Sequence, residues 1–178
     1  MNSTTRAVVA GIAGSLTTNV LHELTRRAWS DAPRVDLLGM QAVAKSFNLL
    51  KLPVPKGRAL YGSTFVVDIV TNSLYFSLVG AVSQEHPVAA GAAAGIVAGC
   101  GAVVLPPRLG LAAQLTNRTA FRRALSIALY TAGGLAAGYT QRALSHGEPQ
   151  LAPTLTIGTQ QQACSGTAAH PRPIPMES

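Results

Sequence analysis

The chain has 178 residues, of which 48% are hydrophobic and only 12% are charged, and its net charge is +7. This composition argues against a soluble globular domain, the alternative being a soluble helical protein rich in Ala and Gly, and it favours a helical membrane protein. Most basic residues flank apolar segments, so we expect contact with the headgroups of a lipid bilayer and no nucleic acid.

The first predicted element is a membrane-spanning helix at residues 7–24. A signal peptide is the alternative, but such a peptide has a more basic start and a cleavage site of small residues after it. Four polar side chains near the end of this span follow the i, i+3, i+4, i+7 spacing of one helix face: Asn19, His22, Glu23 and Arg26.

The connection that follows is polar and basic, and we expect an amphipathic helix in it at residues 35–51. Its apolar residues recur at helical spacing: Leu37, Met40, Ala44, Phe47 and Leu50. This pattern is typical of a helix that lies on the cytoplasmic surface of a membrane. Packing against a partner domain would produce the same pattern, and the sequence leaves both interpretations open.

The second predicted span, at residues 61–82, contains a single charged residue, Asp68. At about 100° per residue its polar side chains gather on one face, among them Tyr61, Asp68, Asn72 and Tyr75. A carboxyl group at this depth must face protein or trapped water. We therefore expect Asp68 to face the first helix, near Asn19 or His22.

The third predicted span, at residues 88–105, follows a turn so short that the second and third helices must be antiparallel neighbours. Three glycines recur along it at every fourth position: Gly91, Gly95 and Gly99. Such a groove lets another backbone approach closely, either within the chain or in a second copy. The two prolines at 106–107 are expected to end this helix.

A fourth, weaker span is predicted at residues 124–140, where Gly134 and Gly138 repeat the small-residue spacing and Tyr130 lies about as deep as Asp68. Beyond it, residues 146–178 are rich in Pro, Gln, Thr and Ser, so we expect a disordered tail. The fold class is therefore expected to be all-α. Residues 1–145 would form an integral membrane bundle of four transmembrane helices plus the surface helix.

Basic residues set the expected orientation of these helices. The first-to-second and third-to-fourth connections hold eleven of the fourteen Lys and Arg residues, seven in the first and four in the second. By the positive-inside rule these connections are cytoplasmic, so both termini are predicted to lie outside the cytoplasm.

This orientation brings the polar groups of three spans to similar depths in the cytoplasmic half. We expect an intramembrane cluster that consists of Asn19, His22, Glu23, Arg26, Tyr61, Asp68, Asn72, Tyr75 and Tyr130. Such a cluster is either a polar clasp that fixes helix packing or a site for a proton or a ligand. Both interpretations stay open at this point.

Known catalytic motifs are not found in the sequence. The segment that begins at His22 starts like the zinc motif H-E-x-x-H but has Arg26 where the second histidine must stand. The chain has no G-x-S-x-G, P-loop or C-x-x-C motif. We therefore expect a protein that is not an enzyme and that uses neither a metal nor a cofactor.

Two short motifs, H-E-x-x-R-R at residues 22–27 and P-R-x-D-x-L-G-M at residues 33–40, give the chain its general appearance. In this it resembles uncharacterised small bacterial inner-membrane proteins of unknown function, which implies an inner-membrane location and no particular activity. Small multidrug resistance transporters also have four short helices, but they use a glutamate within their first span. Here that span has no acid before Glu23, at its edge.

The first hypothesis for function is a structural or accessory membrane subunit that associates with itself or with a larger complex, since the chain has small-residue grooves and lacks a catalytic motif. The alternative is a proton-coupled carrier or channel for small solutes that uses Asp68.

Overall fold

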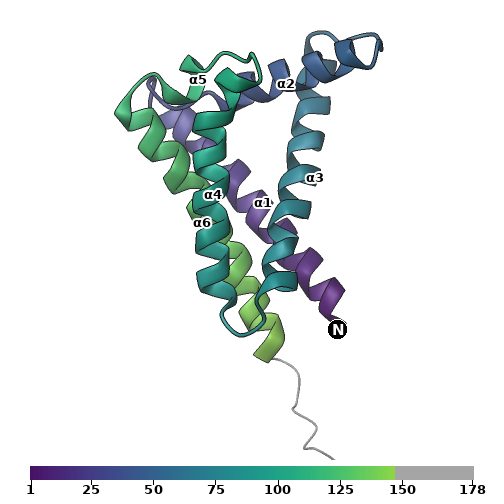
Figure 1. Cartoon of the computed structure of the whole chain (residues 1–178), viewed down its shortest axis with the longest axis vertical. Coiled ribbons are helices and arrows are strands. Elements are labelled where there is room, and N and C mark those ends of the chain that lie inside the picture. The colour runs from purple at the N-terminus through teal and green to yellow at the C-terminus, as the bar shows by residue number, and fades with distance from the viewer. Residues whose placement is uncertain (147–178) are drawn as a thin grey trace, which may run out of the picture. The chain divides into compact units, whose positions relative to one another are not determined.

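The computed structural model describes residues 1–146, and this part of the chain is helical, with six helices and no strand (Figure 1). The helices are α1 (Ser3–Ala28), α2 (Val35–Leu49), α3 (Arg58–Val82), α4 (Pro87–Arg108), α5 (Gln114–Asn117) and α6 (Ala120–His146). The prediction of an all-helical bundle is confirmed for these residues. The tail expected at residues 146–178 lies outside them, apart from the backbone of His146.

The four predicted spans lie within α1, α3, α4 and α6, and the predicted surface helix corresponds to α2. The helices extend beyond the apolar stretches that marked them. At the start of α1, for example, the Asn2 side chain accepts a hydrogen bond from the Thr5 backbone N–H at 2.8 Å and caps the helix ahead of its apolar run. Helix ends thus follow capping and backbone hydrogen bonds, which hydropathy does not report.

The end of α4 differs from the prediction. We expected Pro106 and Pro107 to end the helix after Leu105, but α4 continues through both prolines to Arg108. The short helix α5, which the sequence pattern did not predict, packs beside this end, and two of its side chains donate hydrogen bonds to carbonyl oxygens of α4. The helix tolerates the prolines because these side chains replace donors that proline lacks.

Packing of the long helices does not follow their order in the chain. α4 lies along α6, and α1 packs against both α3 and α6 (Figure 1). α3 and α4 are joined by a short turn but share few contacts, and they separate toward the end that carries α2 (Figure 1). The prediction that they are antiparallel neighbours therefore holds only beside the turn, because the glycines of α4 face α6.

The interior of this bundle consists mostly of small and polar side chains. Within residues 1–146 the largest fully buried side chains are Phe76, Thr18, Thr116, Ser15 and Ser126. Large apolar side chains point outward instead. On α1 they recur at every fourth position: Val8, Ile12, Leu16, Val20 and Leu24. On α3 they include Val66, Val67, Val70, Leu74, Leu78 and Val82. This distribution is the reverse of a soluble domain, whose large apolar residues fill the core.

Two helices of the described part, α3 and α4, are long and apolar enough to cross a membrane, judged by length and composition alone. Only 17% of the most apolar stretch of each is buried within the protein. α1 and α6 do not reach this composition, so the prediction of four spans is supported for two helices and not for four. Inward-facing Gly, Ser and Thr residues lower the mean hydropathy of α1.

Candidate ligand cavity

A cavity of about 310 Å³ lies between α1, α2 and α3, with one ring contributed by α6. Fourteen residues line it: Asn19, His22, Glu23, Arg26, Arg27, Pro33, Val35, Asp36, Gly39, Tyr61, Thr64, Phe65, Asp68 and Tyr130. They include seven of the nine residues of the predicted polar cluster, all except Asn72 and Tyr75. The volume is at the lower end of the range for small-molecule sites, which is about 300–1,000 Å³.

Helical spacing accounts for the way these side chains meet. α1 supplies Asn19, His22, Glu23 and Arg26 from one face, and α3 supplies Tyr61, Thr64 and Asp68. The two helices approach closely at Gly11, where a Cβ would lie 2.2 Å from the Ser73 carbonyl oxygen. Their polar faces are therefore opposed along one half of the helix pair.

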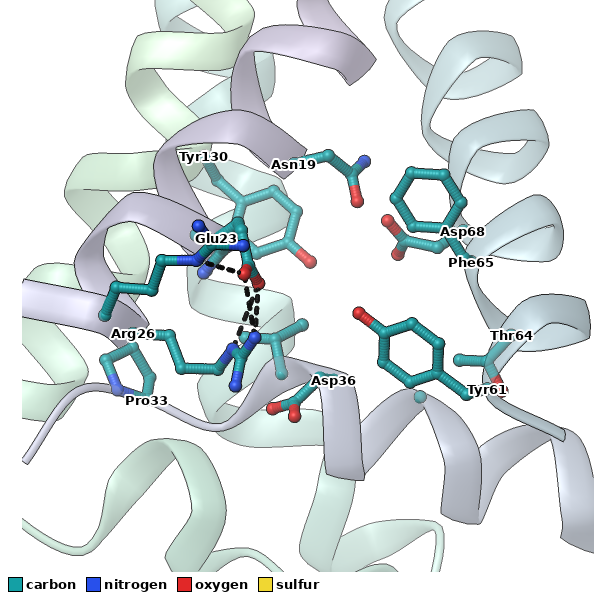
Figure 2. Close-up of a pocket in the computed structure, with 14 residues that line it drawn as sticks. Asn19, Glu23, Arg26, Pro33, Asp36, Tyr61, Thr64, Phe65, Asp68 and Tyr130 are labelled. Atoms are coloured by element: carbon teal, nitrogen blue, oxygen red, sulfur yellow. Dashed lines mark hydrogen bonds and ion pairs between the residues drawn. The ribbon is translucent and has the colours of Figure 1, made fainter. Parts of the chain in front are cut away.

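Asp68 extends from α3 into the cavity and toward α1 (Figure 2). Its carboxylate interacts with the side-chain amides of Asn19 and Asn72. None of the ion pairs formed within residues 1–146 includes Asp68. This acid thus has neutral neighbours in the described part of the chain.

The other acids of the cavity are paired with arginine. Glu23 binds Arg26 and Arg27, each at an N–O distance of 2.7 Å (Figure 2). Asp36 binds Arg34 at 2.9 Å. Burial raises the pKa of Asp36, but hydrogen bonds from Arg34 and from a backbone N–H outweigh burial and hold the pKa of that carboxyl below its usual value. Glu23 and Asp36 together thus face three arginines, and Asp68 is the acid of the cavity that has no arginine partner within residues 1–146.

His22 packs edge-on against Tyr130 of α6, with 5.4 Å between the ring centres. Both ring nitrogens of His22 are buried, and neither has a hydrogen-bond partner within residues 1–146. Leaving a buried polar atom without a partner costs about 1–3 kcal/mol. Because both nitrogens are buried in the protein, this cost falls on the fold, and His22 lines the cavity without opening its nitrogens to it.

The two remaining residues of the predicted cluster lie farther along α3. Asn72 is one turn beyond Asp68 and interacts with it. Tyr75 donates its hydroxyl to the Ala94 carbonyl oxygen of α4 at 2.8 Å and packs against the ring of Phe76. Tyr75 therefore links α3 to α4 and lies outside the cavity lining.

The five glycines singled out for helix packing lie between α4 and α6. They are Gly91, Gly95, Gly99, Gly134 and Gly138. A Cβ on Gly91 would lie 2.2 Å from the Gly134 carbonyl oxygen, and a Cβ on Gly95 would lie 2.5 Å from Thr131 Cα. The groove of α4 is thus filled by a helix of the same chain.

Sequence reasoning missed the wall of the cavity that α2 supplies, which includes Asp36 and Gly39. A Cβ on Gly39 would lie 2.8 Å from the Thr64 methyl carbon, so this glycine lets α2 approach α3. The start of α2 is held by the Arg34 backbone N–H, which donates to the Leu115 carbonyl oxygen at 2.9 Å. Asp36 and Gly39 both belong to the motif at residues 33–40, which was the only available signal.

The cavity is lined by three carboxylates, two guanidinium groups, an amide, an imidazole ring, two phenols and the ring of Phe65. No group of three or more His, Cys, Asp or Glu side chains is arranged to hold a metal ion anywhere in residues 1–146. Groups of this kind suit a small polar molecule or a proton.

No family model matches the sequence, and the searches of curated proteins and of solved structures return no match. The function is therefore inferred from the geometry of the chain itself.

Proposed function

We propose that this chain is an inner-membrane protein with four membrane-crossing helices, and that it binds a small cation or a proton at Asp68 as a carrier or channel and not as an enzyme. The observation that carries the proposal is the position of Asp68. It is an acid without a cationic partner in the described residues, and it lines a cavity inside a bundle whose outer surface is apolar.

The mean hydropathy of α1 is too low to mark it as a membrane span. Its outward face nevertheless supports membrane crossing. Its exposed aliphatic stripe runs from Val8 to Leu24, about 24 Å at the helical rise per residue. The hydrocarbon core of a bilayer is about 30 Å thick. The polar residues of α1, such as Ser15 and Thr18, are buried against protein, where they would not meet lipid. α6 packs between α1 and α4, so fewer of its residues would face lipid.

In the proposed orientation, the end that carries α2 and α5 faces the cytoplasm and both termini lie outside. Eleven of the fourteen Lys and Arg residues belong to the connections at this end. The end of α2 and the segment after it expose Leu49, Leu50 and Leu52 beside Lys51. Apolar and basic side chains in such proximity suit the boundary between headgroups and acyl chains.

The pairing of each acid, and not the net charge of the cavity, favours a cation or a proton at Asp68, since Arg26 and Arg27 line the same cavity. Glu23 and Asp36 already have arginine partners, whereas Asp68 interacts with amides. An acid within a membrane protein is usually paired with a cation or serves as a proton or ion site. Asp68 also lies beside a cavity, which a clasp between helices does not need.

Reconstitution in vesicles tests this proposal. An imposed pH gradient should drive proton or solute flux through the wild-type protein. Asp68→Asn keeps the shape of the side chain and most of its hydrogen bonds but removes its charge, so it should abolish flux and leave the fold intact. Glu85→Gln removes an acid from the turn between α3 and α4 and should retain flux. Normal flux through Asp68→Asn would contradict the proposal.

The exposed apolar face of α3 favours a second candidate, a structural or accessory subunit that associates with itself or with a larger membrane complex. This face carries six exposed large side chains between Val66 and Val82, and α3 separates from α4 toward the end that carries α2 (Figure 1). The glycines of α4 do not add support, because they face α6. Light scattering in mild detergent should then give the mass of an oligomer or of a complex, and a monomer without a bound partner would count against this candidate.

A further inference from the structure

The connection between α2 and α3, residues 49–58, exposes apolar side chains at a corner of the bundle that lies apart from α4 and α6 (Figure 1). We call these residues the α2–α3 turn. Leu49, Leu50 and Leu52 are 75%, 68% and 50% exposed. Neighbouring leucines that are this exposed mark a surface that contacts another molecule or a membrane.

The same turn is basic. Lys51, Lys56 and Arg58 are exposed, and none of them forms an ion pair within residues 1–146. The sequence has no Asp or Glu from residue 37 to residue 67, so no nearby acid along the chain balances these charges. Basic side chains next to apolar ones fit a surface that carries negative charge above an apolar layer.

Lys51 occupies a backbone position that glycine usually takes. α2 ends in a Schellman motif, in which the Leu52 N–H donates to the Phe47 carbonyl oxygen at 2.9 Å and the Lys51 N–H donates to the Asn48 carbonyl oxygen at 3.1 Å. Lys51 follows the C-cap residue of this helix and has a φ of 55°. Glycine adopts this left-handed conformation without the strain that a side chain adds. A lysine in a strained and exposed position points to a function for its charge.

Two aromatic side chains place the turn relative to a bilayer. Trp29 follows the end of α1 and Tyr61 lies in the first turn of α3, both at the end of the bundle that carries α2 (Figure 1). They are 55% and 48% exposed. Because exposed tryptophan and tyrosine are enriched at the interface between membrane and water, this end of the bundle lies at the level of the headgroups.

We propose that the α2–α3 turn binds anionic phospholipid at the cytoplasmic surface of the membrane. Lys51, Lys56 and Arg58 contact the phosphate groups, and the three leucines lie among the upper parts of the acyl chains. This inference rests on the membrane-crossing arrangement of the proposed function. It goes beyond that function, since it assigns a partner to a surface separate from the cavity at Asp68.

A second copy of the chain fits this surface less well than lipid does. In a two-fold symmetric pair the same patch meets itself, so the basic side chains of one turn would face those of the other. No acid between residues 37 and 67 is available to separate them. Lipid phosphates supply the opposite charge, and acyl chains supply the apolar contact.

Quenching of fluorescence by brominated lipids tests the proposal at the turn itself. Trp29 is the single tryptophan of the sequence, so the full-length protein with Trp29→Phe and Leu50→Trp reports from the turn alone. In phosphatidylcholine vesicles that contain phosphatidylglycerol, bromine is placed on the acyl chains of one lipid or of the other. Quenching should show phosphatidylglycerol enriched at the turn by about fivefold or more, because each nearby Lys or Arg favours an anionic surface by about that factor. The enrichment should largely disappear in about 1 M salt.

Lys51→Gly, made in the same reporter protein, separates charge from folding. It removes one charge and the backbone strain together, so the enrichment should fall by about fivefold while the melting temperature is retained or rises. Lys51→Arg keeps the charge and should keep the enrichment. Arg118→Gln removes an exposed charge from the other cytoplasmic connection and is the matched control, which should also keep it. A second reporter, Leu52→Trp, should give the same results.

Three outcomes would overturn the proposal. Without quenching by either lipid at both reporters, the turn does not contact acyl chains. Equal quenching by the two lipids would show that the turn contacts the bilayer with no preference for anionic lipid. Equal losses of enrichment in Lys51→Gly and Arg118→Gln would assign the effect to the net charge of the protein and not to the turn.

The flux experiment keeps this inference distinct from the proposed function. Flux that depends on Asp68, without enrichment of phosphatidylglycerol at the turn, retains the carrier and overturns the lipid site. Enrichment that depends on Lys51, without flux, retains the lipid site and overturns the carrier.

Discussion

The hydroxyl of Thr116 in α5 donates a hydrogen bond to the carbonyl oxygen of Ala102 in α4 at 2.9 Å. In an uninterrupted helix this carbonyl would accept from the N–H of residue 106, but Pro106 has none. The side-chain amide of Asn117, the next residue of α5, donates to the Val103 carbonyl oxygen at 3.3 Å, which Pro107 likewise leaves without its helical donor. Each proline within α4 therefore has a compensating side chain in α5.

The first prediction concerns this compensation. Thr116→Val keeps the volume of the side chain and leaves the Ala102 carbonyl, which is partly buried, without a donor, so it should lower the free energy of unfolding by about 1–3 kcal/mol. In a Pro106→Ala background the restored N–H can bond to Ala102, and the same substitution should cost much less. Unfolding of wild type, the two single variants and the double variant in detergent gives the coupling energy between positions 106 and 116. An equal cost in both backgrounds would contradict the interpretation.

The second prediction concerns the contact between α4 and α6. Gly95→Ala would place a methyl group 2.5 Å from Thr131 Cα, so the two backbones must separate and the protein should lose about 1–3 kcal/mol of stability. Gly101→Ala is a matched control on the same helix, because its added carbon would lie 3.5 Å from one side-chain atom of Leu105. That change should be neutral or stabilise the helix by up to about 1 kcal/mol. Equal melting temperatures of the two variants would exclude the close contact.

The third prediction is a pH dependence at the start of α2. The pKa of Asp36 is held below its usual value near 3.8, so its ionised form stabilises the fold above that pH. This stabilisation disappears as the pH falls through the lower pKa of the folded state. Asp36→Asn should therefore be less stable than wild type by about 0.5–1 kcal/mol at pH 7, since the Arg34 side chain of the pair is 37% exposed.

Thermal unfolding between pH 7 and pH 2 measures the gap between wild type and Asp36→Asn, and the gap should close at the acidic end. Arg34→Gln should lower stability at pH 7 and weaken the same pH dependence, because it removes the partner. A gap that stays constant down to pH 2 would assign the loss to packing instead of charge.

The fourth prediction is the side of the membrane on which each loop lies. In a background with Cys100→Ser and Cys164→Ser, single cysteines at Lys45 and Arg118 should react with an impermeant reagent only after the membrane is opened. A cysteine at Ser3 should react in intact cells, because both termini are proposed to lie outside. The opposite pattern would invert the orientation, and reaction at all three positions in intact cells would argue against membrane crossing.

The positions of Asn19 and Asp68 illustrate how far sequence patterns reach. Each residue belongs to a polar stripe at helical spacing, and the order of the spans brings both stripes to similar depth. The structure places them in one cavity. Periodicity therefore reports which face of a helix is polar and roughly how deep it lies.

The helix that packs against α4 is an example of what such patterns do not predict. Gly91 and Gly134 each belong to small-residue stripes, but the same spacing would suit a contact with α3 or with a second copy. The short turn before Pro87 favoured α3, whereas the fit of two backbones selected α6. This fit depends on the relative rotation of two helices, which no local pattern encodes.

The position of α2 could not be predicted from the sequence either. Its place depends on single contacts, such as Gly39 against Thr64 and the Arg34 N–H with Leu115, and not on a repeated pattern. Asp36 therefore stayed outside the predicted cluster although it lines the cavity.

The interior of this bundle holds small and polar side chains, and its large apolar side chains lie outside. This arrangement determines which positions tolerate substitution. On α1, outward positions such as Leu16 are exposed, so exchanges among aliphatic residues should change the fold little. A single methyl group added at Gly11, by contrast, would meet the Ser73 carbonyl oxygen at 2.2 Å. Across many generations the smallest side chains of this bundle should be its slowest-changing positions and the largest should be its freest, the opposite of the order that governs a protein folded in water.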